Sequence, residues 1–114
     1  MKVLLVDDDV DLLDVTAYAL RREGFNVIAA TDGMHALQRW ETDTPDLIVS
    51  DVSMPRMDGL ELCRRVRQDS KTPVILLTGL NREDEVIKGF QVGADDYVTK
   101  PFSPKQLAMR ILWR

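Results

Sequence analysis

The chain is poor in the features that build disulfide-linked, zinc-binding or membrane-spanning proteins. It has a single cysteine, Cys63, among 114 residues, which excludes an internal disulfide and a zinc site built on cysteines. No apolar run is long enough to cross a bilayer. Met1-Lys2 leads directly into an apolar strand pattern that has no signal-peptide character. We therefore expect a cytoplasmic protein without a membrane partner.

The chain also lacks a surplus of positive charge. The chain has 15 lysines and arginines against 19 aspartates and glutamates, which gives a formal net charge of -4. Because binding to a phosphate backbone needs a surplus of basic residues, this composition argues against a domain that holds nucleic acid by itself. With 45% hydrophobic residues, the 114-residue chain can bury one core but is too short for two.

Short apolar runs alternate with segments of helical periodicity along the whole chain. The predicted strands are residues 3–6, 27–30, 47–51, 74–77 and 95–99. The apolar faces of the intervening helices are predicted at Val10, Leu13, Ala17 and Leu20, at Leu37 and Trp40, at Leu62, Cys63 and Val66, at Val86, Ile87 and Phe90, and at Leu107, Ala108 and Ile111. Arg64, Arg65 and Arg67 are expected on a solvated face. This alternation predicts a parallel sheet with helices on both faces and right-handed crossovers.

Polar residues stand where four of these runs end. The continuous run 47–49 indicates a strand buried on both faces, so Asp51 stands at the carboxyl end of a central strand. Asp7 and Asp8 follow the first run, Thr78 follows the fourth and Lys100 follows the fifth. Open α/β sheets bind ligands at this edge. The sequence therefore predicts that these side chains form one site.

Closely placed carboxylates at such an edge suit a hard divalent cation, and Mg2+ prefers oxygen ligands. We expect Asp8 and Asp51 as direct ligands, Asp7 as a ligand through water, and the backbone carbonyl of Ser53 as a further oxygen. The prediction is a magnesium site.

A threonine and a lysine beside a metal match the needs of phosphoryl transfer, in which negative charge spreads over the transferred oxygens. A carboxylate can act as the nucleophile and form an aspartyl phosphate. Asp51 is the best candidate because its strand is central. Lys100 is expected to pair with one phosphoryl oxygen and the Thr78 hydroxyl to donate to another.

Each of these residues also has a purely structural interpretation. Asp51 can cap a turn, residues 7–9 can favour the start of the first helix through its dipole, Thr78 is an ordinary strand residue and Lys100 can be solvated. Their shared location favours a site. The Lys100–Pro101 bond is a candidate for a cis peptide, with a trans proline that helps to begin the last helix as the alternative.

From end to end, the chain resembles a receiver domain of a two-component response regulator. The motifs that carry the resemblance are Val6-Asp7-Asp8, residues 47–55 (LIVSDVSMP), Met57-Asp58-Gly59, Leu77-Thr78-Gly79 and residues 93–102 (GADDYVTKPF). The resemblance implies a flavodoxin-like (βα)5 fold, doubly wound, with a five-stranded parallel sheet of order 2-1-3-4-5.

The resemblance also implies a regulatory role and no enzymatic turnover of a substrate. Asp51 would accept a phosphoryl group from a sensor histidine kinase with Mg2+, Asp7 and Asp8 would be the acidic pair, and Lys100 would pair with the phosphate. The Lys100–Pro101 bond would be cis. Phosphorylation would change the face made by the fourth helix, the fifth strand and the fifth helix.

Two residues would carry that change. In the family the hydroxyl at Thr78 moves toward the phosphoryl group and the aromatic ring at Tyr97 turns inward behind it. The alternative for Tyr97 is a half-exposed side chain that packs on the sheet edge. Ser53 and Leu80 flank the predicted site and could tune hydrolysis of the phosphoryl group.

The run 95–102 further resembles transcription factors of the OmpR/PhoB type. That implies a homodimer on phosphorylation, with a face made of Lys88, Asp95, Asp96, Gln106 and Arg110, in which Asp95 pairs with a residue beyond Arg114. Gln106 stands where the family usually has a glutamate. This difference would remove the ionic partner of Lys88 and leave at most a hydrogen bond to the neutral Gln106 amide. Residues 1–114 would be the N-terminal receiver of a longer protein, with DNA bound only through a C-terminal domain.

Three alternatives stay open. A haloacid-dehalogenase-type phosphatase also combines a strand-end Asp-x-Asp with Thr, Lys and Mg2+, but that family expects Thr or Val where Asp11 stands, and the chain has no spare residues for a cap. A flavodoxin-like nucleotide binder would want a Gly-rich or hydroxyl-rich loop where residues 7–9 are acidic. A stand-alone receiver or phosphorelay intermediate is the third.

Overall fold

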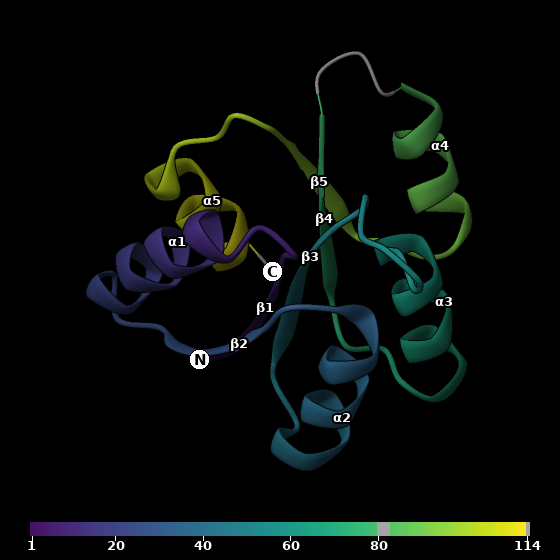
Figure 1. The fold of residues 1–114 in the computed structure, drawn as a ribbon, viewed down its shortest axis with the longest axis horizontal. Helices are drawn as coiled ribbons and strands as arrows, with labels where there is room; N and C mark the ends of the chain where they lie inside the picture. Colours follow the sequence, from purple (N-terminus) through teal and green to yellow (C-terminus); the bar gives the residue numbers. More distant parts are fainter. Residues whose placement is uncertain (80–82, 114) are drawn as a thin grey trace.

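Five parallel strands form one sheet in the order β2-β1-β3-β4-β5 in the computed structural model, which describes residues 1–79 and 83–113. Figure 1 shows strands and helices alternating along the chain. The elements are β1 Lys2–Val6, α1 Val10–Arg22, β2 Asn26–Ala30, α2 Gly33–Asp43, β3 Leu47–Asp51, α3 Gly59–Asp69, β4 Val74–Thr78, α4 Glu83–Gln91, β5 Asp96–Thr99 and α5 Pro104–Leu112. None of these helices has both the length and the apolar character needed to cross a membrane. The predicted flavodoxin-like fold and strand order are confirmed.

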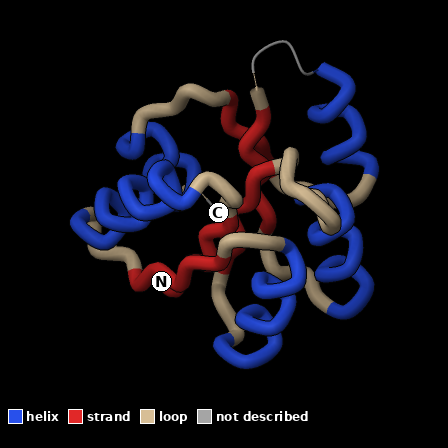
Figure 2. The backbone as a smooth tube through the Cα atoms, viewed as in Figure 1, coloured by secondary structure: helices blue, strands red, loops and turns tan. Residues whose placement is uncertain are grey.

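The sheet lies between two helical layers. Helices α1 and α5 cover one face, and α2, α3 and α4 cover the other (Figures 1 and 2). Strand β3 supplies Val49 to the core under α1 and α5 and Ile48 to the core under α2 and α3. Because successive side chains of a strand point to opposite faces, a strand covered on both sides needs an unbroken apolar run.

The register of the parallel strands brings their functional ends to the same edge. Val6 of β1 lies beside Ser50 of β3, and Thr78 of β4 lies beside Thr99 of β5. The residue after each strand therefore emerges at nearly the same level of the sheet. This edge carries the candidate site.

Aspartate side chains begin three of the helices. Asp9, Asp32 and Asp58 each accept a hydrogen bond from the backbone amide three residues later, at the start of α1, α2 and α3. Such a cap satisfies one of the amides that a helix start leaves unpaired and stabilises the protein by about 1 kcal/mol.

Three residues that the helical periodicity assigns to inner faces are in fact exposed. Val10, Ile87 and Phe90 have exposed fractions of 52%, 52% and 50%. Val10 is the first residue of α1, at the open edge of the sheet. In α4, only Gly89 is buried among the described residues, so this helix lies lightly on the sheet. Periodicity identified the apolar side of α4 but not how shallowly it packs.

The prediction that Arg67 lies on the solvated face of α3 is wrong. Its guanidinium donates to the carbonyl oxygens of Ser70 at 3.2 Å, Thr72 at 2.8 Å and Gly93 at 2.8 Å, and to the carboxylate of Asp95 at 3.1 Å. A planar guanidinium carries five N–H donors, so one side chain can serve several acceptors. Arg67 ties the loop after α3 to the turn before β5.

Candidate functional site

Asp51 ends β3 at the open edge of the sheet and is only 7% exposed. Both of its carboxylate oxygens have partners. The Lys100 ammonium donates to Oδ2 at 2.8 Å, and the backbone amide of Ser53 donates to Oδ1 at 3.3 Å. The Ser53 side chain itself is exposed. The acceptor predicted from sequence is therefore held in a defined orientation from two sides.

The loop after Asp51 returns tightly to the strand that it leaves. The amide of Gly59 donates to the carbonyl of Val52 at 2.9 Å, and a Cβ at Gly59 would collide with the backbone carbonyl oxygen of Asp51. Only a glycine allows the start of α3 to approach the acceptor strand so closely. Helix α3 thus fixes the backbone that carries Asp51.

Lys100 follows β5 and reaches across the edge to the acidic side chains. Its backbone amide donates to the Thr78 carbonyl at 2.6 Å, which continues the ladder between β5 and β4. Its ammonium lies 2.8 Å from Asp51 Oδ2 and 3.2 Å from Asp7 Oδ2. The Lys100–Pro101 peptide bond is cis. The structure thus brings together a cation and two carboxylates that come from three strands.

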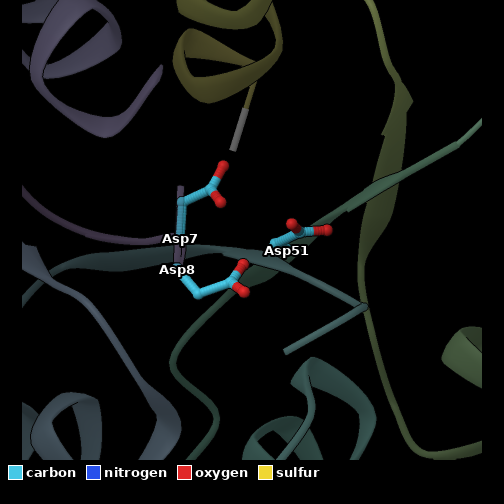
Figure 3. Close-up of side chains that lie close together, drawn as sticks. All are labelled: Asp7, Asp8 and Asp51. Atoms are coloured by element: carbon cyan, nitrogen blue, oxygen red, sulfur yellow. The ribbon is translucent and has the colours of Figure 1, made fainter. Parts of the chain in front are cut away.

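Asp7, Asp8 and Asp51 form an acidic cluster in which carboxylate oxygens lie within 4.8 Å of one another. Figure 3 shows these side chains gathered where β1 and β3 end. Asp7 is buried and accepts a hydrogen bond from the Asp9 amide at 3.0 Å, whereas Asp8 is exposed. A donor set made only of carboxylate oxygens, one of them open to solvent, fits a hard divalent cation.

Burial and charge act against each other at this edge. Burial raises the pKa of Asp51, and the negative charge of Asp7 adds to the rise, while the Lys100 ammonium lowers it; the net effect is a raised pKa. For Lys100, burial lowers the pKa, but the two carboxylates outweigh it and the net pKa is raised. Lys100 therefore stays positively charged at neutral pH.

The Thr78 hydroxyl ends β4 and is buried, but it does not face the acceptor. It donates to the Glu85 carboxylate at 3.1 Å and to the Gly79 carbonyl at 3.2 Å. Within residues 1–79 and 83–113, no hydrogen bond joins the Thr78 hydroxyl to the side chain of Asp51 or Lys100. Sequence reasoning missed Glu85, because an acidic residue in the first turn of a helix is usual. Leu80, the other predicted neighbour, lies outside the described residues.

An open cleft of about 530 Å3 adjoins the acidic cluster. Its lining includes Asp8 and Ser53 on one side and Glu85 and Lys88 of α4 on the other. Lys88 was assigned to a dimer face by resemblance, and the structure places it at this cleft as well. The cleft leaves the edge of the sheet open beside Asp8.

Residues 3–112 match the family described as the response regulator receiver domain. The chain belongs to this family. Among curated relatives, it is 44% identical over 111 residues to the alkaline phosphatase synthesis transcriptional regulatory protein PhoP of Bacillus subtilis, a match that covers 96% of this chain and 46% of PhoP. The chain spans about half the length of the curated relatives it matches. The similarity to PhoP supports the OmpR/PhoB-type subgroup.

Solved structures give the same family. The receiver domain of the Francisella response regulator 1452 is 38% identical with a TM-score of 0.91, and the match covers 98% of this chain and 93% of that one. The chemotaxis protein CheY4 of Vibrio cholerae is 35% identical with a TM-score of 0.92, over 98% of this chain and 96% of the other. As a response regulator receiver, the chain is a component of two-component signalling.

In this receiver domain, Tyr97 points outward. Its side chain is 37% exposed, and its ring packs edge-to-face on Phe90 with centroids 5.8 Å apart. A narrow space beneath α4 is lined by Thr78, Glu85, Phe90 and Tyr97, so the two residues predicted to switch border the same space. The packing on Phe90 joins β5 to α4.

The residues of the predicted dimer face already make contacts within the single chain. Arg110 donates to both carboxylate oxygens of the buried Asp96, at 2.9 and 2.7 Å. Asp95, which the sequence places in the fifth strand, precedes β5, and its carboxylate accepts from Arg67 at 3.1 Å and from the Val74 amide at 2.8 Å. Gln106 lines a groove beside Tyr97. These ion pairs fix Asp95, Asp96 and Arg110 of the predicted dimer face within the single chain.

Proposed function

We propose that this receiver domain is a phosphorylation-controlled switch in which Asp51 accepts a phosphoryl group from a sensor histidine kinase. The observation that carries the proposal is the environment of Asp51. The carboxylate lies 2.8 Å from the Lys100 ammonium, inside an acidic cluster that borders an open cleft. Family membership supports the kinase as the partner.

In the proposed transfer, a carboxylate oxygen of Asp51 forms a bond to phosphorus while the bond from phosphorus to the imidazole nitrogen of the kinase breaks. The nitrogen keeps the electron pair and takes up one proton, and the product on Asp51 is an acyl phosphate. Lys100 stays protonated and stabilises the negative charge on the phosphoryl oxygens. The Thr78 hydroxyl donates to a second oxygen after the transfer.

Mg2+ is the proposed cofactor. Asp8 and Asp51 would hold it directly, Asp7 would hold it through water, and the Ser53 carbonyl would supply a further oxygen. When bound, the ion neutralises the charge that gathers on the transferred group. The all-oxygen acidic cluster supports this choice over a softer metal.

The output of the switch is proposed to be transcription. PhoP is named a transcriptional regulatory protein, and this chain matches about half of it. We infer that DNA is bound by a part of the protein outside residues 1–114, since the net charge of -4 disfavours binding by the receiver itself. A stand-alone receiver or phosphorelay intermediate stays open, and a cytoplasmic location stays a prediction.

Phosphorylation is tested by incubating the protein with acetyl phosphate and Mg2+ and recording its intact mass. One added phosphoryl group is expected in the wild-type protein and none in Asp51→Asn or in a sample with EDTA. Modification of Asp51→Asn at the wild-type level would place the acceptor elsewhere. Catalytic release of phosphate from a small ester, at many turnovers per protein, would instead favour the phosphatase alternative.

Dimerisation is proposed to follow phosphorylation through α4, β5 and α5. Sedimentation velocity with and without beryllofluoride, a phosphoryl mimic, measures it directly. We expect Arg110→Ala to weaken the dimer, because it removes the side chain that orders Asp96 on this face. Lys105→Ala on the same helix is the matched control and should dimerise like wild type. Equal dimerisation of both variants would exclude Arg110 from the interface.

A further inference from the structure

The Thr78 hydroxyl has one proton to donate, and two different acceptors compete for it. In this structure the proton is directed to Glu85 and Gly79. In the proposed phosphorylated state, the same proton is directed to an oxygen of the group on Asp51. A hydroxyl has a single proton, which cannot be directed toward Glu85 and Gly79 and toward the phosphoryl group at the same time, so the two arrangements exclude each other.

Glu85 is placed to hold the first arrangement. It lies in the first turn of α4, is half-buried, and borders both the cleft beside Asp8 and the narrow space beneath α4 that Tyr97 also lines. Its carboxylate oxygen lies 3.1 Å from Thr78 Oγ1. A carboxylate can only accept hydrogen bonds, so a phosphoryl anion cannot replace Thr78 as its partner.

The contact also links strand β4 to a helix that is otherwise lightly held. Only Gly89 is buried in the described part of α4, so few apolar contacts fix its start. A hydrogen bond from a buried hydroxyl to a carboxylate is stronger than one between neutral groups. Release of Thr78 therefore removes one link between β4 and the start of α4 at the same time as it frees the hydroxyl.

We propose that Glu85 is a positioning residue that holds the Thr78 hydroxyl and the start of α4 in the resting arrangement, in opposition to the phosphoryl group on Asp51. This inference rests on the proposed function. Coupling of this kind is reciprocal: whatever weakens the Thr78–Glu85 contact strengthens binding of a phosphoryl group, and the reverse.

The experiment measures the affinity for beryllofluoride in the presence of Mg2+ by calorimetry, in five variants beside wild type. Glu85→Asp keeps the charge but shortens the reach by one methylene. Glu85→Ala removes both the negative charge and the carboxylate that contacts Thr78. Asp84→Asn removes a neighbouring charge at the same cleft and leaves the Thr78 contact in place. Thr78→Ala, alone and combined with Glu85→Asp, reports whether the effect acts through the hydroxyl.

We expect Glu85→Asp and Glu85→Ala to bind beryllofluoride about three- to tenfold more tightly than wild type, the range that one hydrogen bond supplies. The affinity of Asp84→Asn should stay within about twofold of the wild-type value, since Asp84 is exposed and salt screens the charges of exposed side chains. In the Thr78→Ala background, Glu85→Asp should have no further effect. Thermal unfolding of each variant verifies that it is folded.

Two results would overturn the inference while leaving the proposed function intact. One is wild-type affinity in Glu85→Asp. The other is a gain of the same size in the Thr78→Ala background, which would assign the effect to charge or to helix packing. A wild-type protein that neither binds beryllofluoride nor accepts phosphate from acetyl phosphate would instead remove the proposed function itself.

Discussion

The β3–α3 unit and the β4–α4 unit are neighbours, and each is a strand followed by a helix. The two helices nevertheless differ greatly in how many of their side chains are buried. Helix α3 buries Leu62, Cys63 and Val66 completely. Helix α4 buries only Gly89 among its described residues, and Ile87 and Phe90 are about half exposed. Strands β3 and β4 are both fully buried, so the difference lies in the helices: α3 is firmly packed, whereas the described part of α4 buries little apolar surface.

This difference matches the roles proposed for the two units. An acceptor carboxylate has to stay in place so that Lys100 and the acidic cluster keep their distances to it. A switch has to rearrange, and elements that rearrange come from the least stable parts of a protein. Substitutions in the two units should therefore differ in their effects on stability.

Leu62→Ala should cost much more stability than Ile87→Ala. Leu62 is fully buried in α3, so its truncation leaves a cavity and should cost about 2–5 kcal/mol. Ile87 in α4 is 52% exposed, and its truncation should cost less than about 1 kcal/mol. Urea denaturation of both variants measures the two values. Similar losses would mean that α4 is as firmly packed as α3.

Gly59→Ala should destabilise the protein by about 3 kcal/mol, the upper range for overpacking. The added Cβ meets the backbone carbonyl of Asp51, which cannot move without displacing the acceptor. Acetyl-phosphate labelling should slow in the same variant. Unchanged stability and labelling together would show that α3 can withdraw from β3 freely.

Asp51→Asn should stabilise the protein by about 0.5–2 kcal/mol at neutral pH without added metal. A buried carboxylate that is kept for function costs stability, and replacing such a group commonly gives a gain of this size. The pKa of Asp51 is raised above its ordinary value of 3.8. Between the two pKa values the folded protein holds a proton that the unfolded chain has released, so wild-type stability falls as the pH rises from about 4 through the folded-state pKa. In the variant, the Lys100 ammonium keeps its ion pair with Asp7, so the substitution does not leave it unpaired.

The measurement is denaturation of wild type and Asp51→Asn at a series of pH values in EDTA. The difference in unfolding free energy should be small below pH 4 and reach its full size above the raised pKa. A difference that is already present at low pH, or that has the opposite sign, would contradict this account of the site.

Gly89→Ala should change stability by less than about 1 kcal/mol. Alanine favours a helix over glycine by about that amount, and its Cβ would lie 2.8 Å from the Leu76 Cδ1 atom, the end of a flexible side chain. The two effects oppose each other. Equilibrium denaturation beside Gly59→Ala gives a matched pair of helix glycines, and a loss as large as that of Gly59→Ala would remove the contrast between the two units.

Much of this arrangement could be predicted from the sequence. Unbroken apolar runs such as 47–49 identify strands that are covered on both faces, and parallel strands necessarily end at one edge. The strand-end positions of Asp51 and Lys100 therefore indicated a shared site before any distance was known. The strand order itself came from the resemblance to receiver domains, because periodicity does not say which strands are neighbours.

Other features could not be predicted because they depend on contacts between segments distant in the chain. Arg67 has the local pattern of a solvated helix residue, but its partners lie in two loops, one of them 26 residues away. Ile87 and Phe90 repeat at helical spacing like core residues. They are exposed because α4 packs only lightly against the sheet. Helical spacing shows which side of a helix is apolar, but not how deeply that side is buried.

The sequence by itself determined the alternation of strands and helices and the set of polar residues at the strand ends, because these depend on local pattern and on the geometry of a parallel sheet. Only the tertiary structure decided that Lys100 bridges Asp51 and Asp7 and that Thr78 faces Glu85 instead of the acceptor. A hydroxyl has several acceptors within reach, and its choice depends on ångström-scale packing of a helix that no local pattern specifies.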